Sequence, residues 1–168
     1  MAYSSVPKIR RDGTITLLDS GATNTLNIAY EEGSFSFDQT KPDRIVLRDR
    51  STISTVRKGD EQPITGSFSF YMRQFTSASA GSALDFIKKT GSYSGNTSTG
   101  ATGAPYVEEY AIDIKITVDG GSVGDDSGED SHTATFARCV ATASFSEGDP
   151  NQFTISFECF GGVTYGAA

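Results

Sequence analysis

Residues 44 to 72 read RIVLRDRSTISTVRKGDEQPITGSFSFYM, and this stretch decides the expected fold. Its first half contains β-prone residues such as Ile45, Val46 and Val56, but charged side chains interrupt them. A strand buried on both faces cannot hold so many charges, because an unpaired buried charge is very costly. The stretch therefore predicts an extended arm that leaves the body of the protein. The basic residues of this arm are Arg44, Arg48, Arg50, Arg57 and Lys58.

The second half of the stretch predicts a strand of the body. From Pro63 onward, the apolar residues Ile64, Phe68 and Phe70 fall on one face, and small polar residues fall on the other. An arm (about residues 41–62) that continues directly into a core strand is suited to contacting a second copy of the chain or another protein.

Length and composition indicate a single β-rich domain covering residues 1–168. Eleven Phe residues and 18 Gly residues, with many Ser and Thr, favour strands and turns over helices. The formal net charge of −7 argues against nucleic-acid binding, which requires a basic surface. The sequence shows neither a signal peptide nor an apolar run long enough to cross a bilayer, so no membrane partner is expected.

Charge is unevenly distributed along the chain. Residues 41–58 contain six basic residues and two acids, whereas residues 106–131 contain eight acids and one lysine. Oppositely charged regions allow one copy to attract another head to tail, which produces rings or filaments. We expect the arm to face acids between Glu108 and Asp130 of a neighbouring copy. Two solvated loops would have the same composition, so both interpretations stay open.

The last two strands can be aligned from the sequence. With a turn near Asp149, Cys139 lies opposite Cys159 and Phe145 lies opposite Phe153. A slip of one residue would mix apolar and polar faces, so the alternation itself selects this register. The expected buried residues are Phe68, Phe70, Phe145, Phe153, Ile155 and Phe157. The expected polar face contains Thr142, Ser144, Thr154, Ser156 and Glu158.

The remaining segments are one helix, several strands and two loops. Ser82 and Asp85 form a capping box that starts a helix at about 83–90. Residues 91–105 form a Gly/Ser/Thr-rich loop, predicted to be flexible with nothing to pack, and residues 119–131 form an acidic turn. The other expected strands are residues 14–18, 25–30, 34–37, 64–73 and 107–118.

No residue pattern indicates catalysis. The single histidine, His132, has no Cys or Asp spaced to form a triad with it. Neither enzymatic activity nor a cofactor is expected. The acidic turn offers oxygen ligands for Ca²⁺, but it lacks the spacing of a helix–loop–helix calcium site. Cys139 and Cys159 are expected to be free thiols, while a cross-strand disulfide would require an oxidising compartment.

The order of features from residue 40 to 162 resembles that of the major tail tube proteins of long-tailed bacteriophages (siphophages). The matching features are a charged arm, a Gly-Ser-Phe strand, a short helix with an Ala-Leu pattern, and three closing strands. Here they read RDRSTISTVRKGDEQPITGSFSFYM, SALDFIKKTG, YVEEYAIDIKITVDGG and ATFARCVATASFSEGDPNQFTISFECFGG. The resemblance implies a mostly β, sandwich or barrel-type tail tube fold with one short outer α-helix and a long protruding β-arm.

The resemblance also implies a function. Subunits of this family form hexameric rings whose sheets join into a barrel, and the rings stack into a hollow tube. The arm would bridge to the neighbouring ring, other tail proteins would bind the tube ends, and DNA would pass through without specific binding. The protein would reside in the virion tail after assembly in the host cytoplasm.

The Ser/Thr-rich faces suit a wet channel wall, and the net acidity of the chain would repel DNA phosphates. An ordinary β-sandwich with a solvated polar face explains these faces equally well, although it does not explain the arm. Two other functions therefore stay open: another ring or tube protein, such as a secretion-system tube or a tail terminator, and a monomeric β-sandwich binding module.

Overall fold

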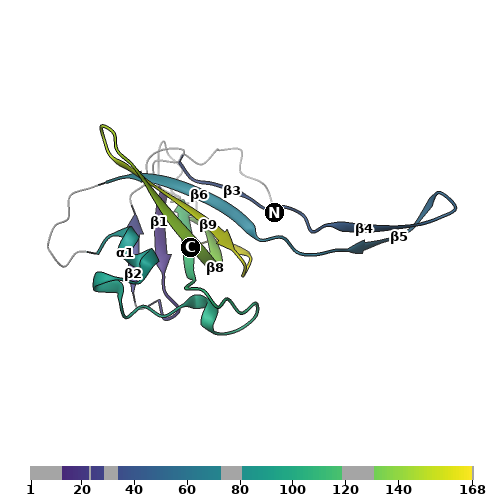
Figure 1. Ribbon diagram of the computed structural model, residues 1–168, viewed down its shortest axis with the longest axis horizontal. Coiled ribbons are helices and arrows are strands. Elements are labelled where there is room, and N and C mark those ends of the chain that lie inside the picture. Colours follow the sequence, from purple (N-terminus) through teal and green to yellow (C-terminus); the bar gives the residue numbers. More distant parts are fainter. Residues whose placement is uncertain (1–12, 23, 29–33, 73–80, 119–130, 168) are drawn as a thin grey trace.

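The computed structural model describes residues 13–22, 24–28, 34–72, 81–118 and 131–167. These residues form an antiparallel eight-stranded sheet and a separate two-stranded sheet (Figure 1), so the fold is mostly β, as predicted. The large sheet has the order β2-β1-β7-β8-β9-β6-β3, and β10 pairs with β8. Its strands are β1 (Gly13–Leu18), β2 (Thr25–Ile28), β3 (Ser36–Asp38), β6 (Ile64–Tyr71), β7 (Ile112–Val118), β8 (His132–Ser146), β9 (Gln152–Cys159) and β10 (Val163–Ala167).

Strand β8 bends the large sheet in its middle. Its first half pairs with β7 and β10, whereas its second half pairs with β9. At the junction, Arg138 has a φ of 56°, and its main-chain N–H donates a hydrogen bond to Asp113 Oδ1 (2.9 Å). The register with β7 shifts beside it, between Ile112 and Ile114. A bulge of this kind bends a strand, so the two halves of the sheet can enclose one core.

The core contains residues from both halves of the sheet and from the helix. Ile15 and Leu17 of β1 belong to the same buried cluster as Phe68 of β6. The rings of Phe136 and Phe157 meet edge to face, with their centroids 5.4 Å apart. Helix α1 (Ala83–Lys88) contributes Phe86, which is fully buried.

The predicted register of the last hairpin is confirmed. Cys139 lies opposite Cys159, and Phe145 lies opposite Phe153 at the far end of the two strands. Both cysteines are buried free thiols. Burial raises the pKa of the Cys139 thiol well above its usual range.

The predicted burial is only partly correct. Pairing between β7 and β8 ends at Cys139, so the last rows of the β8–β9 hairpin extend past the β7 half of the sheet. Phe145, which we expected to be buried, is 53% exposed there. Phe70 and Phe153 are half-buried, whereas full burial is confirmed for Phe68, Ile155 and Phe157.

The helix begins as predicted, with reciprocal hydrogen bonds between Ser82 and Asp85. Hydrogen bonds from Ser82 lower the pKa of Asp85, and the side chain of Ser82 contributes more than its backbone N–H. The helix ends at Lys88 rather than at residue 90, because Lys89 adopts the left-handed conformation (φ 54°).

Residues 91–110, which we call the loop segment, pack against the body. The expectation that residues 91–105 have nothing to pack is therefore wrong. Asn96 is 1% exposed, and its Nδ2 donates a hydrogen bond to the Tyr110 hydroxyl (3.1 Å). Ser98 Oγ accepts from the N–H of Ala111 (3.0 Å). A polar segment can pack in this way because its side chains satisfy main-chain groups that would otherwise be buried without partners.

Two further differences concern the neighbouring segments. The strand expected at 107–118 begins only at Ile112, because the preceding residues belong to the loop segment. The guanidinium group of Arg138 donates to the carbonyls of Ala104 and Thr102, which ties the loop segment to the bend in β8. The acidic turn predicted at 119–131 lies outside the described residues, except for Ser131.

Candidate assembly surfaces

The arm is an antiparallel hairpin that forms its own sheet and extends away from the body (Figure 1). It consists of β4 (Arg44–Asp49) and β5 (Thr52–Lys58), and every residue of both strands is exposed. Arg50 and Ser51 connect them in a two-residue turn with φ values of 44° and 71°, which fits the twist of a tight hairpin. The sequence expectation of an arm leaving the body is thus confirmed.

Both faces of the arm carry apolar side chains. Val46 lies opposite Val56, and a register shift after Leu47 places Ile53 opposite Arg48, on the same face as the two valines. The other face carries Ile45 and Leu47. These five apolar residues, Ile45, Val46, Leu47, Ile53 and Val56, are between 42% and 56% exposed. Exposed apolar patches of this kind mark surfaces that bind another molecule.

The same hairpin holds the basic residues singled out from the sequence. Arg44, Arg48 and Lys58 share the face of the valines, and Arg57 lies on the other face. Lys58 forms an ion pair with Glu61 at the base of the arm. Within the described part of the chain, none of the four arginines of the arm forms an ion pair. Their charges are therefore available to a partner.

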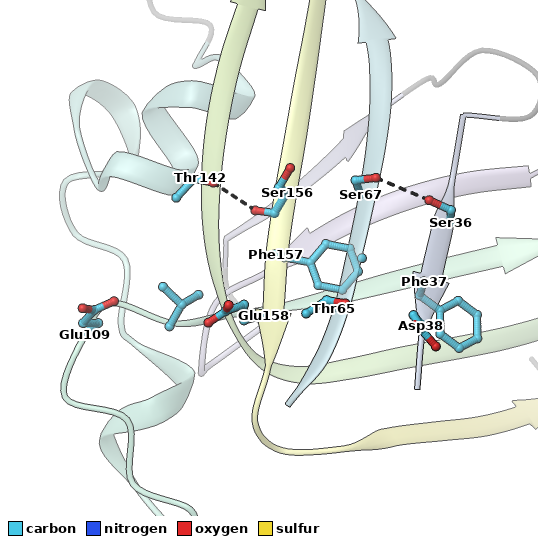
Figure 2. A pocket seen from close by; sticks show the side chains of 12 residues that line it. Ser36, Phe37, Asp38, Thr65, Ser67, Glu109, Thr142, Ser156, Phe157 and Glu158 are labelled. Atoms are coloured by element: carbon cyan, nitrogen blue, oxygen red, sulfur yellow. Dashed lines mark hydrogen bonds between the residues drawn. The ribbon is translucent and has the colours of Figure 1, made fainter. Parts of the chain in front are cut away.

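Four strands, β3, β6, β9 and β8, carry a second surface, which we call the polar face. It brings together the five residues predicted from the sequence, Thr142, Ser144, Thr154, Ser156 and Glu158. Strands β6 and β3 extend the rows, so that Ser36, Ser67, Ser156 and Thr142 lie side by side (Figure 2). Ser36 and Ser67 are linked through their hydroxyls (3.3 Å). The contribution of β3 was not anticipated from the sequence.

The polar face is acidic at the end where the arm begins. Asp38, Thr65, Glu158 and Val140 form the next row, and Glu109 lies beside them (Figure 2). These residues border an open hollow of about 740 Å³. In the rows where these four strands pair, from Val140 to Ser146 on β8, no residue is a Lys or Arg. The arrangement gives a surface of short hydroxyl side chains with acids and without bases.

A third surface lies at the end of the β8–β9 hairpin. We call it the tip patch, and it consists of Phe70, Met72, Phe145 and Phe153. The ring of Phe153 lies 5.7 Å from Phe70 and 5.2 Å from Phe145, measured between centroids. Met72 is 46% exposed and Phe145 is 53% exposed. The sequence analysis missed this surface, because it assigned all three phenylalanines to the core.

The described residues contain no cluster of three or more His, Cys, Asp or Glu that could hold a metal ion. The proposed calcium ligands of the acidic turn lie outside them. Among the described helices, none has the length and apolar character needed to span a membrane. His132 is exposed at the start of β8.

No protein-family model matches the sequence, and a search of curated proteins finds no similar sequence. Solved structures, in contrast, are similar over nearly the whole chain. A chain of the PVC sheath–tube complex, from an extracellular contractile injection system, matches with a TM-score of 0.58 at 16% identity. The alignment covers 98% of this chain and 94% of that one.

Two other solved structures show the same similarity. The cap that terminates the tube of the anti-feeding prophage matches with a TM-score of 0.60 at 15% identity, over 100% of this chain and 96% of that one. The SPP1 tail tube matches with a TM-score of 0.54 at 10% identity, over 96% and 80%. The protein therefore has the fold found in tail tube proteins.

Proposed function

We propose that this protein is the structural subunit of a phage tail tube, of the kind made by long-tailed bacteriophages. Its copies form hexameric rings, the rings stack into a hollow tube, and the tube conducts DNA from the capsid to the host. The observation that carries the proposal is the arm, an exposed hairpin with apolar and basic side chains, on a body with the tail tube fold. The role is structural, without catalysis or a cofactor.

In this proposal the arm bridges to a neighbouring ring. Arg44, Arg48, Arg50 and Arg57 pair there with acidic groups, because they have no ion-pair partner in the described part of their own chain. One exposed ion pair is worth less than about 1 kcal/mol. Repetition around a ring multiplies this contribution, and the apolar side chains of the arm add buried area to every joint.

The polar face lines the lumen in the same proposal. Its short hydroxyl side chains leave the channel wet, and its acids, such as Asp38 and Glu158, repel phosphates. DNA therefore passes along this wall without specific binding. Proteins at the two ends of the tube are the other partners. The assembled tube belongs to the virion tail and forms in the host cytoplasm, without a membrane.

A second candidate function is a tube or tube-terminating protein of a contractile injection system. The similarity to a sheath–tube complex and to a tube-terminating cap favours it. Both candidates form rings, and stacking separates a tube-terminating protein from the tube subunits of either system. A terminator forms single rings, whereas a tube subunit stacks without a fixed limit.

Electron microscopy of the purified protein tests the proposal. We expect hollow tubes built from six-fold rings; single rings would favour the terminator, and featureless monomers would contradict both candidates. The variant Arg48→Glu/Arg50→Glu/Arg57→Glu should keep the melting temperature of the wild type but form no tubes, because like charges would face each other at every joint.

The matched control is Arg48→Lys/Arg50→Lys/Arg57→Lys, which preserves the charge of the arm and should still polymerise. High salt should weaken wild-type assembly, because exposed ion pairs are screened over about 8 Å at physiological ionic strength. Full-length tubes from the glutamate variant would show that the arm does not hold the rings together.

A further inference from the structure

The arm and the tip patch lie at opposite ends of the same strands. Strand β6 begins at Ile64, next to the base of the arm, where it pairs with Cys159. It ends at Tyr71, which pairs with Gln152 beside the turn of the β8–β9 hairpin. Figure 1 shows the arm leaving one end of the body and this turn projecting from the other. When copies are stacked in one orientation, the arm of one copy therefore points toward the tip of the next.

The tip patch is apolar, so it can contact the exposed apolar side chains of the arm. The Phe153 ring stacks on Phe70 and is tilted against Phe145, and Met72, two residues after Phe70, is exposed. Rings of this kind bind aliphatic side chains, and their faces also attract guanidinium groups. The arm presents Val46, Ile53 and Val56 on one face, with arginines beside them.

The charges of the two ends are also complementary. The turn beside the tip patch carries Glu147 and Asp149, both exposed. Neither forms an ion pair within the described residues. From residue 139 to residue 168 the chain contains no Lys or Arg, and Arg73, which follows Met72, lies outside the described residues. The arm, in contrast, has five basic residues and one acid between positions 44 and 58.

Two of the acids expected from the sequence to receive the arm, Glu108 and Glu109, are less well placed, while those from Asp119 to Asp130 lie outside the described residues. Glu108 and Glu109 border a hollow together with Phe160, and Phe160 also borders the hollow at Pro42 and Pro63, at the base of the arm. They therefore lie at the same end of the body as the arm itself. A copy stacked in the same orientation presents its tip to the arm before it presents this end.

We propose that the arm of one copy binds the tip patch of a second copy of this chain, head to tail. This inference rests on the proposed stacking function, for which it names the binding surface. The valines and isoleucine of the arm cover Phe145 and Phe153, and the arginines of the arm lie close to Glu147 and Asp149. Each strand of the arm has six or seven residues. At about 3.3 Å per residue, the arm reaches roughly 20 Å beyond its base.

Cross-linking tests which surface receives the arm. Cys139 and Cys159 are almost fully buried, so cysteines introduced at exposed positions are the reactive ones. Ser54→Cys on the arm is combined with Ser146→Cys at the tip, and assembled protein is treated with a bismaleimide. We expect a ladder of linked chains on a denaturing gel. The matched control, Ser54→Cys with Glu108→Cys, should give no ladder; a ladder from the control pair alone would overturn the proposal.

A charge exchange gives an independent readout. Glu147→Lys/Asp149→Lys should reduce the yield of pelletable polymer about tenfold or more while leaving the melting temperature unchanged, because the turn is exposed. Adding Arg48→Glu/Arg50→Glu to the same chain should restore polymerisation. Phe145→Ser, at an exposed position, should also lower the yield.

The outcomes separate this inference from the proposed function. If the wild-type protein forms tubes and the tip variants polymerise equally well, the tube function stands and the tip patch is not the binding surface. If the wild type forms no polymer under any condition, both proposals fail.

Discussion

The arm and the loop segment each show the opposite burial from the one that their composition favours. The arm contains Ile, Val and Leu residues that favour burial, yet all residues of its strands are exposed. The loop segment is rich in Gly, Ser and Thr, yet Asn96 and Gly100 are buried within it. Composition therefore does not decide burial in this protein.

The difference lies in where each segment forms its main-chain hydrogen bonds. The loop segment bonds to the body: the Thr97 carbonyl accepts from Ser20 N–H (3.0 Å), and Thr99 N–H donates to the Ala111 carbonyl (2.9 Å). The two strands of the arm bond to each other, and the base is closed by a bond from Gly59 N–H to the Asp43 carbonyl (2.6 Å). The loop segment is thus part of the fold, whereas the apolar side chains of the arm do not pack in the core of the body.

The comparison predicts the largest stability difference between an aromatic residue of the body and an apolar residue of the arm. Phe157→Ala should lower the free energy of unfolding by about 3 to 5 kcal/mol, because Phe157 is 2% exposed and its ring packs on Phe136. Val56→Ala should change it by less than about 0.5 kcal/mol. Chemical denaturation of the unassembled subunit measures both. Equal effects of the two substitutions would mean that the arm belongs to the cooperative fold.

A second prediction concerns two glycines of the loop segment. A Cβ at Gly100 would lie 2.7 Å from Val107 Cβ and 2.8 Å from the Val107 carbonyl oxygen, so Gly100→Ala should cost about 1 to 3 kcal/mol. At Gly95 a Cβ would meet no atom within 4 Å. Gly95→Ala is therefore the matched control and should be nearly neutral. Thermal melts of the two variants that coincide would show that the loop segment is not packed as described.

The smallest expected effect is at Asp85, which also accepts a hydrogen bond from Thr90 Oγ1 (3.1 Å) where the loop segment begins. Asp85→Asn should cost about 0.5 to 1 kcal/mol at neutral pH, through the weakened cap. Because folding lowers the pKa of Asp85, its contribution is present above the usual pKa near 3.8 and is lost as the pH falls through the lower folded value.

Melting curves of wild type and Asp85→Asn should therefore converge as the pH falls below the usual pKa near 3.8. A difference that stays constant between pH 7 and pH 2 would contradict this assignment.

The features that the sequence predicted depend on alternation and charge. The register of Cys139 with Cys159 follows from a strict two-residue period, which also brings Thr142 and Ser156 onto one face. The arm follows from charges that no core could hold. Ser82 and Asp85 predict the start of the helix because capping is local.

The features that it missed depend on contacts between distant residues. The exposure of Phe145 depends on where pairing with β7 ends, which no local pattern shows. The packing of the loop segment depends on the bond between Ser98 and Ala111, across twelve intervening residues. The bend in β8 depends on an arginine with positive φ, which sequence patterns do not indicate. Such contacts are decided by the whole fold, so residue order alone does not reveal them.

The isolation of the arm has a kinetic consequence. A two-stranded hairpin without a third strand or a covering layer is only marginally stable in water. Part of the free energy gained at each joint is therefore spent on ordering the arm of the incoming subunit. Two free subunits meeting in solution gain one such contact, whereas a subunit arriving at an existing ring gains support from several neighbours. Growth from a template should thus outpace spontaneous initiation, so that the number of tubes is set by the number of templates.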